Sequence, residues 1–142
     1  MGPPSFVADA SIAIAWIHPS QATAATQSML AAIAEGAVFE VPAIWSLEVA
    51  NALIVLKRRE RITERERKFA IERLAMLPHV IDGESPAFAF GRISELAIKY
   101  GLSVYDAAYL ELAQRRRLPL GCKDGPLLEA ARKARVEIWP GM

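Results

Sequence analysis

The sequence predicts an α/β fold built on a parallel β-sheet that helices cover on both faces. Short apolar runs alternate with longer helix-forming segments along the 142 residues. These runs are apolar throughout rather than polar at every second position, which is the pattern of strands buried on both faces. No repeat, low-complexity tract or long linker divides the chain. We therefore expect a single domain over residues 1–142, with residues 1–4 as a disordered or cloning-derived tail.

Five short strands and seven helical segments are expected from this alternation. The strands are Phe6–Ala8, Val38–Val41, His79–Asp82, Pro119–Cys122 and Val136–Trp139, and the helical segments are 11–17, 21–36, 43–60, 63–76, 85–100, 103–113 and one that begins at 125. Gly36 and Gly101 are typical helix ends, because glycine adopts the left-handed conformation that often closes a helix. Thr63 with Glu66 has the spacing of a capping box, and Ser103 is a suitable N-cap.

Composition excludes several classes of protein. Hydrophobic residues make up 53% of the chain, yet no apolar run is long enough to cross a bilayer and no signal peptide is present. Cys122 is the only cysteine, so an internal disulfide is impossible. With His18 and His79 far apart, no zinc-ligand spacing can be assembled. We expect a cytoplasmic protein that does not contact a membrane.

Positive charge is distributed unevenly along the chain. No Lys or Arg precedes Lys57, whereas basic residues crowd the segment 57–68, KRRERITERERK. One interpretation is a solvated pair of helix ends in which Glu and Arg form ion pairs. The other is a surface for nucleic acid or for an acidic partner.

Two aspartates follow expected strands. Asp9 ends the first strand and Asp124 follows the fourth. Ligands of open α/β sheets bind beyond the carboxyl ends of the strands, so both carboxylates would lie at the same edge if these strands are neighbours. The alternative for each is an Asp that caps the helix after it.

Two further acids interrupt apolar helical stretches. Glu48 has no other charged residue after it until Lys57, and Asn51 lies three residues later on the same side of the helix. A buried Glu beside a buried Asn would need partners, unless Glu48 extends to the surface or bonds to a loop. Asp106 lies among alanines and aromatics, three residues after Ser103, so it could also be a capping-box acid.

Together the four acids indicate a metal-dependent nuclease. Two carboxylates about 4 Å apart repel by roughly 4 kcal/mol at an effective dielectric near 20, so a cluster of them needs a cation. Ligands that are all oxygen suit Mg²⁺, with Mn²⁺ as a substitute. Such an ion activates a water and offsets charge on a phosphodiester, which favours phosphodiester hydrolysis.

Four segments resemble, in order and spacing, the motif regions of PIN-domain ribonucleases, specifically the VapC-type toxins of toxin-antitoxin pairs. They are VADASIAIAW, PAIWSLEVANAL, SVYDAAYLELA and LPLGCKDGPLLEAARKARVEI. The resemblance implies a three-layer α/β/α fold with a five-stranded parallel sheet. It also implies that Asp9, Glu48, Asp106 and Asp124 are catalytic, that Asp9, Asp106 and Asp124 hold the metal, and that Ser11 and Asn51 support them.

The resemblance further implies endonucleolytic cleavage of RNA, a homodimer, and inhibition by a cognate antitoxin whose C-terminal segment enters a groove of the toxin. The helix pair 44–59 and 63–76 is the part that usually meets the antitoxin. Four of its apolar residues could line the groove or pack in the core: Trp45, Leu53, Leu56 and Phe69.

One position departs from the family pattern. Cys122 stands where a Thr or Ser usually precedes the last acid by two residues, and Lys123 follows it. A thiol is a weaker donor than a hydroxyl, so this departure bears on metal affinity and on the role of Asp124. Two alternatives remain at this stage. One is a PIN-like binding module without turnover, and the other is a Mg²⁺-dependent phosphatase or receiver-type domain that would use Asp82 and Lys123.

Overall fold

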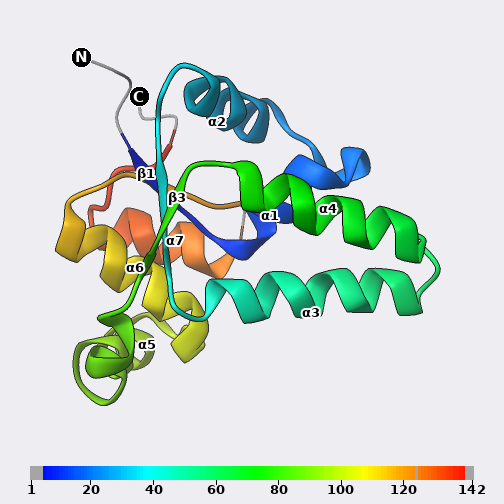
Figure 1. Ribbon diagram of the computed structural model, residues 1–142. Coiled ribbons are helices and arrows are strands. Elements are labelled where there is room, and N and C mark those ends of the chain that lie inside the picture. The colour runs from blue at the N-terminus through cyan, green and yellow to red at the C-terminus, as the bar shows by residue number, and fades with distance from the viewer. Residues whose placement is uncertain (1–4, 124, 140–142) are drawn as a thin grey trace.

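The protein folds as alternating strands and helices in the order that the sequence predicts (Figure 1). The structure is a computed structural model that describes residues 5–123 and 125–139. The strands are β1 (Phe6–Ala8), β2 (Phe39–Pro42), β3 (His79–Asp82) and β4 (Leu120–Gly121). The α-helices are α1 (Ala10–Ile17), α2 (Ala24–Ala34), α3 (Trp45–Arg58), α4 (Glu64–Met76), α5 (Ser94–Tyr100), α6 (Val104–Arg116) and α7 (Pro126–Lys133). Within the described ranges, no helix is both long and apolar enough to cross a bilayer.

The sheet has four parallel strands in the order β3-β2-β1-β4. The expected fifth strand at Val136–Trp139 is wrong: in the described part of this segment, only Ile138 forms a bridge, parallel to Leu120. The Leu120 N–H donates to the Glu137 carbonyl at 2.8 Å, and the Trp139 N–H donates to the Leu120 carbonyl at 3.0 Å. Because β4 is only two residues long, it offers this segment a single pairing position.

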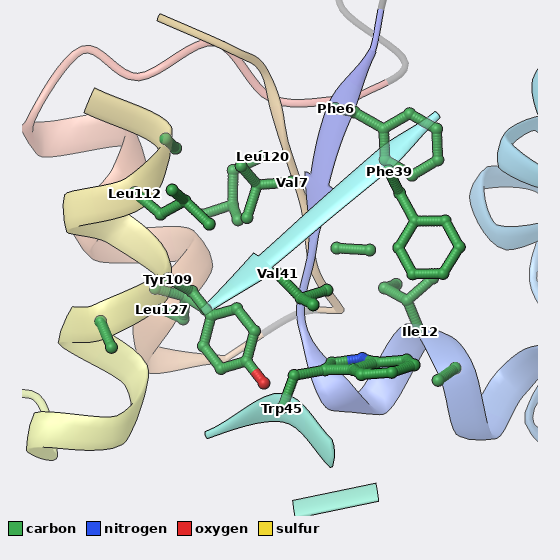
Figure 2. Close-up of a cluster of buried hydrophobic side chains, with 14 of the residues drawn as sticks. Phe6, Val7, Ile12, Phe39, Val41, Trp45, Tyr109, Leu112, Leu120 and Leu127 are labelled. Carbon is green, nitrogen blue, oxygen red and sulfur yellow. The ribbon is translucent and has the colours of Figure 1, made fainter. Parts of the chain in front are cut away.

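Helices cover both faces of the sheet. On one face, the Phe39 ring packs against Trp16 of α1 and Trp45 of α3, with ring centroids 5.2 and 5.8 Å apart. On the other face, Glu40 pairs with Arg116 of α6 at 2.9 Å. Figure 2 shows α6 and α1 on opposite sides of β1 and β2, with buried side chains between the layers. The result is a three-layer α/β/α arrangement whose core lies on both sides of the central strand pair.

Local signals predict most helix ends well, with one exception. The Thr63 hydroxyl accepts from the Glu66 N–H at 3.0 Å and the Glu66 carboxylate accepts from the Thr63 N–H at 2.8 Å, so the capping box is present. The expected single helix over 85–100 is wrong. It consists of a 3-10 turn (Ser85–Phe88), a π-helical turn (Ala89–Ile93) and α5. The Ser94 hydroxyl donates to the Ala89 carbonyl, five residues earlier, at 2.6 Å, a bond that fits this wider turn.

Helices α3 and α4 lie side by side as an antiparallel pair that extends beyond the sheet (Figure 1). Between them and β3 lies a largely apolar hollow of about 300 Å³, lined in part by Trp45, Leu53 and His79. Of the four residues expected at a groove, Trp45 and Leu53 line this hollow. Leu56 instead packs against the core, and Phe69 is 58% exposed outside the hollow.

A buried ion-pair network ties α6 to the end of β3. The Arg115 guanidinium donates to Glu111 at 2.7 Å and to Asp82 at 2.6 Å. It also lies 4.8 Å from the centre of the Phe88 ring. Glu111 is only 3% exposed, so its charge depends on this arginine.

We predict that Arg115→Gln destabilises the fold by about 3 kcal/mol, because it leaves the Glu111 carboxylate buried without a cation. Urea unfolding followed by circular dichroism measures this change. The neighbouring Arg117→Gln is the control. Arg117 is exposed and forms no ion pair within the described residues, so its effect should stay within about 0.5 kcal/mol. Equal effects of the two substitutions would contradict the role of Arg115.

Candidate active site

Three of the four predicted acids stand at the N-terminal ends of helices, at the carboxyl edge of the sheet. Asp9 follows β1 as the N-cap residue of α1, Glu48 lies in the first turn of α3, and Asp106 lies in the first turn of α6. Helix N-termini carry a partial positive charge that favours anionic side chains. The fold therefore directs acids from three distant segments toward one region.

Asp9 is held by β4 and by Ser11. Its backbone N–H donates to the Gly121 carbonyl at 3.1 Å, and the Ser11 hydroxyl donates to its carboxylate at 2.5 Å. Burial raises the pKa of Asp9 from 3.8 to about 6, the Ser11 bond limits the rise, and the charge of Asp106 adds to it. The N–H groups of Ser11 and Ile12 lower this pKa, but neither forms a full capping bond with the carboxylate. Capping therefore does not account for Asp9.

Glu48 is oriented by Tyr109, which sequence reasoning missed. The Tyr109 hydroxyl donates to Glu48 Oε1 at 2.7 Å, and Figure 2 shows this hydroxyl extending away from α6. Burial raises the pKa of Glu48, the Tyr109 bond opposes the rise, and the charge of Asp106 reinforces it. Burial and the neighbouring Glu48 raise the pKa of the Tyr109 hydroxyl, so it stays a donor at neutral pH. The available signal was spacing, since Tyr109 lies three residues after Asp106 on the same side of α6.

Asp106 couples the other two acids. The Ser103 hydroxyl accepts from the Asp106 N–H at 3.0 Å, which caps α6. In the part of the chain that the structure describes, the Asp106 carboxylate makes no return bond of the kind that Glu66 makes, so the capping box is incomplete. Burial raises the pKa of Asp106. Because its charge also raises the pKa of Asp9 and of Glu48, the three carboxylates share one electrostatic environment.

Among the described acids that are at least partly buried, those of this region differ from the others in lacking cations. Within residues 5–123 and 125–139, Asp9, Glu48 and Asp106 form no ion pair with Lys or Arg. Acids elsewhere that do form such pairs are Glu40, Glu64, Asp82, Glu84, Glu95 and Glu111. In the described part of the protein, no Lys or Arg therefore neutralises these three carboxylates at the edge of the sheet.

The donor set fits a hard divalent cation. Among the described residues, no group of three or more His, Cys, Asp or Glu side chains could hold a metal ion. Mg²⁺ does not need such a group, because it keeps several waters and binds through one or two carboxylates together with substrate phosphates. Asp9 and Asp106 supply carboxylates of this kind, and their mutual repulsion would be relieved by a cation.

The remaining predicted residues have mixed outcomes. Ser11 contacts Asp9 as described above, whereas the expectation that Asn51 is buried is wrong, because its side chain is exposed on α3. A polar residue within an apolar helix stretch can simply mark the solvent side. Asp124 lies outside the described residues. Lys123, just before it, donates to the Gln21 carbonyl at 3.2 Å.

The receiver-type alternative is not favoured by this arrangement. Asp82, its only phospho-acceptor, is bound to Arg115, and β3 lies at the opposite end of the strand order from β4, which precedes Lys123. A phospho-accepting Asp and a catalytic Lys would need to face the same ligand.

Comparison with solved structures identifies the same fold in other proteins. The structure of PAE2754 from Pyrobaculum aerophilum superposes with a TM-score of 0.61 at 20% identity, over 90% of this chain and 87% of that one. VapBC2 from Rickettsia felis, bound to a DNA fragment from their promoter, gives a TM-score of 0.59 at 14% identity, over 84% and 86%. A toxin-antitoxin complex from Klebsiella pneumoniae gives 0.56 at 19% identity, over 84% and 87%. No protein-family model and no curated protein matches the chain.

We predict that Asp9→Asn changes how stability depends on pH in metal-free buffer. Because the pKa of Asp9 rises from 3.8 to about 6 on folding, the folded state binds more protons between these values, and stability falls as pH rises through them. The wild-type protein should lose about 2 to 3 kcal/mol more than Asp9→Asn between pH 4 and pH 7. Urea unfolding at several pH values measures the difference, and parallel profiles would contradict the raised pKa.

Proposed function

We propose that this chain is a Mg²⁺-dependent endoribonuclease that acts as the toxin of a toxin-antitoxin pair. The observation that carries the proposal is the convergence of Asp9, Glu48 and Asp106 without a cation of their own. The shared fold with a toxin-antitoxin complex and with VapBC2 supports the biological class. The motif resemblance supports the RNA substrate.

Asp9, Asp106 and Asp124 would hold the ion, or a pair of ions, with Mn²⁺ as a substitute. A bound Mg²⁺ supplies an activated water and offsets negative charge on the phosphodiester. The Ser11 hydroxyl fixes the orientation of the Asp9 carboxylate, since it donates to one oxygen and leaves the other available.

Glu48 would act as the general base. The Tyr109 hydroxyl occupies Oε1, which leaves Oε2 to accept a proton from the attacking water. Burial raises the pKa of Glu48 toward neutrality, which improves a carboxylate as a proton acceptor at physiological pH. Tyr109 is then a positioning residue, because it acts through Glu48.

The partners in this proposal are a cognate antitoxin and a second copy of the chain, in the cytoplasm. Beside the acids, a largely apolar hollow of about 280 Å³ is lined in part by Leu47, Val104 and Tyr105. All three side chains are substantially exposed. Burial of this surface would favour a homodimer. The mass of the purified protein in solution tests this assembly.

We predict Mg²⁺-dependent cleavage of single-stranded RNA that EDTA abolishes. Asp106→Asn should reduce the rate by at least about 100-fold, because it removes one of the carboxylates that would hold the ion. Tyr109→Phe should lower kcat by roughly tenfold while RNA affinity is retained, since the general base loses its orientation but remains present. Gel analysis of labelled RNA measures these rates.

The matched control is Glu95→Gln, which removes an exposed acid of α5 that, among the described residues, pairs with Arg92 alone, at 3.8 Å. This variant should cleave as the wild type does. Cleavage that persists in both Asp9→Asn and Asp106→Asn, or that is unaffected by EDTA, would contradict the proposed function.

A further inference from the structure

The turn between α3 and α4 carries an excess of positive charge. The segment 57–68 holds seven basic and three acidic residues. Figure 1 shows this turn at the far end of the helix pair, away from the sheet. The whole chain has a net charge of only +1, so the excess of positive charge is concentrated at this turn and is not spread over the protein.

Ion pairing within the turn accounts for only part of that charge. Glu64 binds both Lys57, at 3.1 Å, and Arg67, at 2.7 Å, while Glu66 caps α4 through the Thr63 N–H. Five basic side chains of the turn are exposed and form no ion pair within the described residues. These five, named the basic tip, are Arg58, Arg59, Arg61, Arg65 and Lys68.

The basic tip is aligned with the candidate active site along α3. Glu48, Ala52 and Val55 are separated by four and three residues, so they follow one side of the helix, and Arg59 is the residue at which the helix ends. At 1.5 Å per residue, Arg59 lies about 16 Å along the axis from Glu48. Ala52 and Val55 are partly buried, whereas the adjacent Asn51 and Ile54 are exposed. A polymer that starts at Glu48 and runs along the exposed border of α3 therefore reaches the basic tip.

Without a bound cation, the candidate active site does not attract a polyanion. Its three carboxylates are uncompensated, and within the described residues none of them pairs with Lys or Arg. Lys123, the nearest cation along the chain to Asp124, is bound to the Gln21 carbonyl. A second surface with positive charge would therefore add affinity for a nucleic-acid backbone.

We propose that the basic tip binds the phosphate backbone of the RNA whose phosphodiester is cleaved at the acids. The inference rests on the proposed function, because it assigns the RNA a path from Glu48 along α3. At about 3.4 Å per stacked nucleotide, the 16 Å separation corresponds to about five nucleotides. The contacts are to phosphates, so they position RNA of any sequence. An acidic protein partner would not require the alignment with Glu48, which is why RNA is favoured.

The tip variant carries Arg58→Gln and Arg59→Gln together. It is compared with a control variant that loses the same amount of positive charge. The control pair is Arg132→Gln with Lys133→Gln, which are exposed at the end of α7. All proteins also carry Asp106→Asn so that bound RNA stays intact. Fluorescence anisotropy with a labelled 20-nucleotide single-stranded RNA, in Mg²⁺ and at several salt concentrations, gives the affinity and its salt dependence.

The tip variant should lower the slope of log affinity against log salt by about 1.4, since each lost phosphate contact removes about 0.7. Affinity at 0.1 M salt should fall by roughly 10- to 30-fold, while the control binds as the parent does. A 4-nucleotide RNA is too short to span the two surfaces, so the parent should bind it more weakly than the 20-nucleotide RNA. Thermal melting should show that both variants remain folded.

Equal binding of the 20-nucleotide RNA by the tip variant and the control would overturn the inference. Loss of binding to a polyglutamate peptide, with RNA binding unchanged, would overturn it as well and assign the tip to an acidic protein. These outcomes differ from failure of the proposed function. If the proposed function fails, the protein that retains Asp106 cleaves no RNA in Mg²⁺, whether or not the tip variant binds RNA.

Discussion

Repulsion of Asp9 and Glu48 by the charge of Asp106 is the constraint on which the candidate site depends. Each carboxylate is placed by the start of a different helix, so none can move away without disturbing the layer that it begins. Burial raises the pKa values of all three, and the charge of Asp106 adds to the rise for Asp9 and Glu48, which means that ionising them costs the fold free energy. A fold keeps carboxylates in such an unfavourable position where a bound cation or substrate offsets the cost in free energy. This offset is the physical basis of the proposed chemistry.

Helix α6 connects the candidate site to the rest of the fold. Its first turns carry Asp106 and Tyr109, which reach the other acids, and its last turns carry Arg115 and Arg116, which bind the edge of β3 and β2. Glu111, between them, is neutralised by Arg115. The same helix thus presents uncompensated acids at one end and fully paired charges at the other. Its rigid attachment fixes the position of Asp106 relative to Asp9.

Sequence patterns predicted the strand and helix order because apolar runs and capping residues act locally. They failed where the outcome depended on distant partners. Ile138 has strand-like neighbours, yet the short β4 leaves it one bridge. Asn51 was placed in the interior on spacing alone, although spacing does not say which side of a helix meets the core. Tyr109 was overlooked because its bond to Glu48 joins residues 61 positions apart. The strand-end argument applied to Asp9 and Asp124, of which Asp124 lies outside the described residues, while the grouping of Glu48 and Asp106 with Asp9 came from the motif resemblance.

Titration calorimetry with Mn²⁺ tests the central claim most directly. If the uncompensated carboxylates form a cation site, the wild-type protein binds Mn²⁺, and Asp9→Asn and Asp106→Asn each weaken the affinity by at least about tenfold. Glu95→Gln, which removes an exposed acid that pairs with Arg92, leaves the affinity for Mn²⁺ unchanged. Absence of Mn²⁺ binding by the wild-type protein, or equal affinity in all four proteins, would contradict the account.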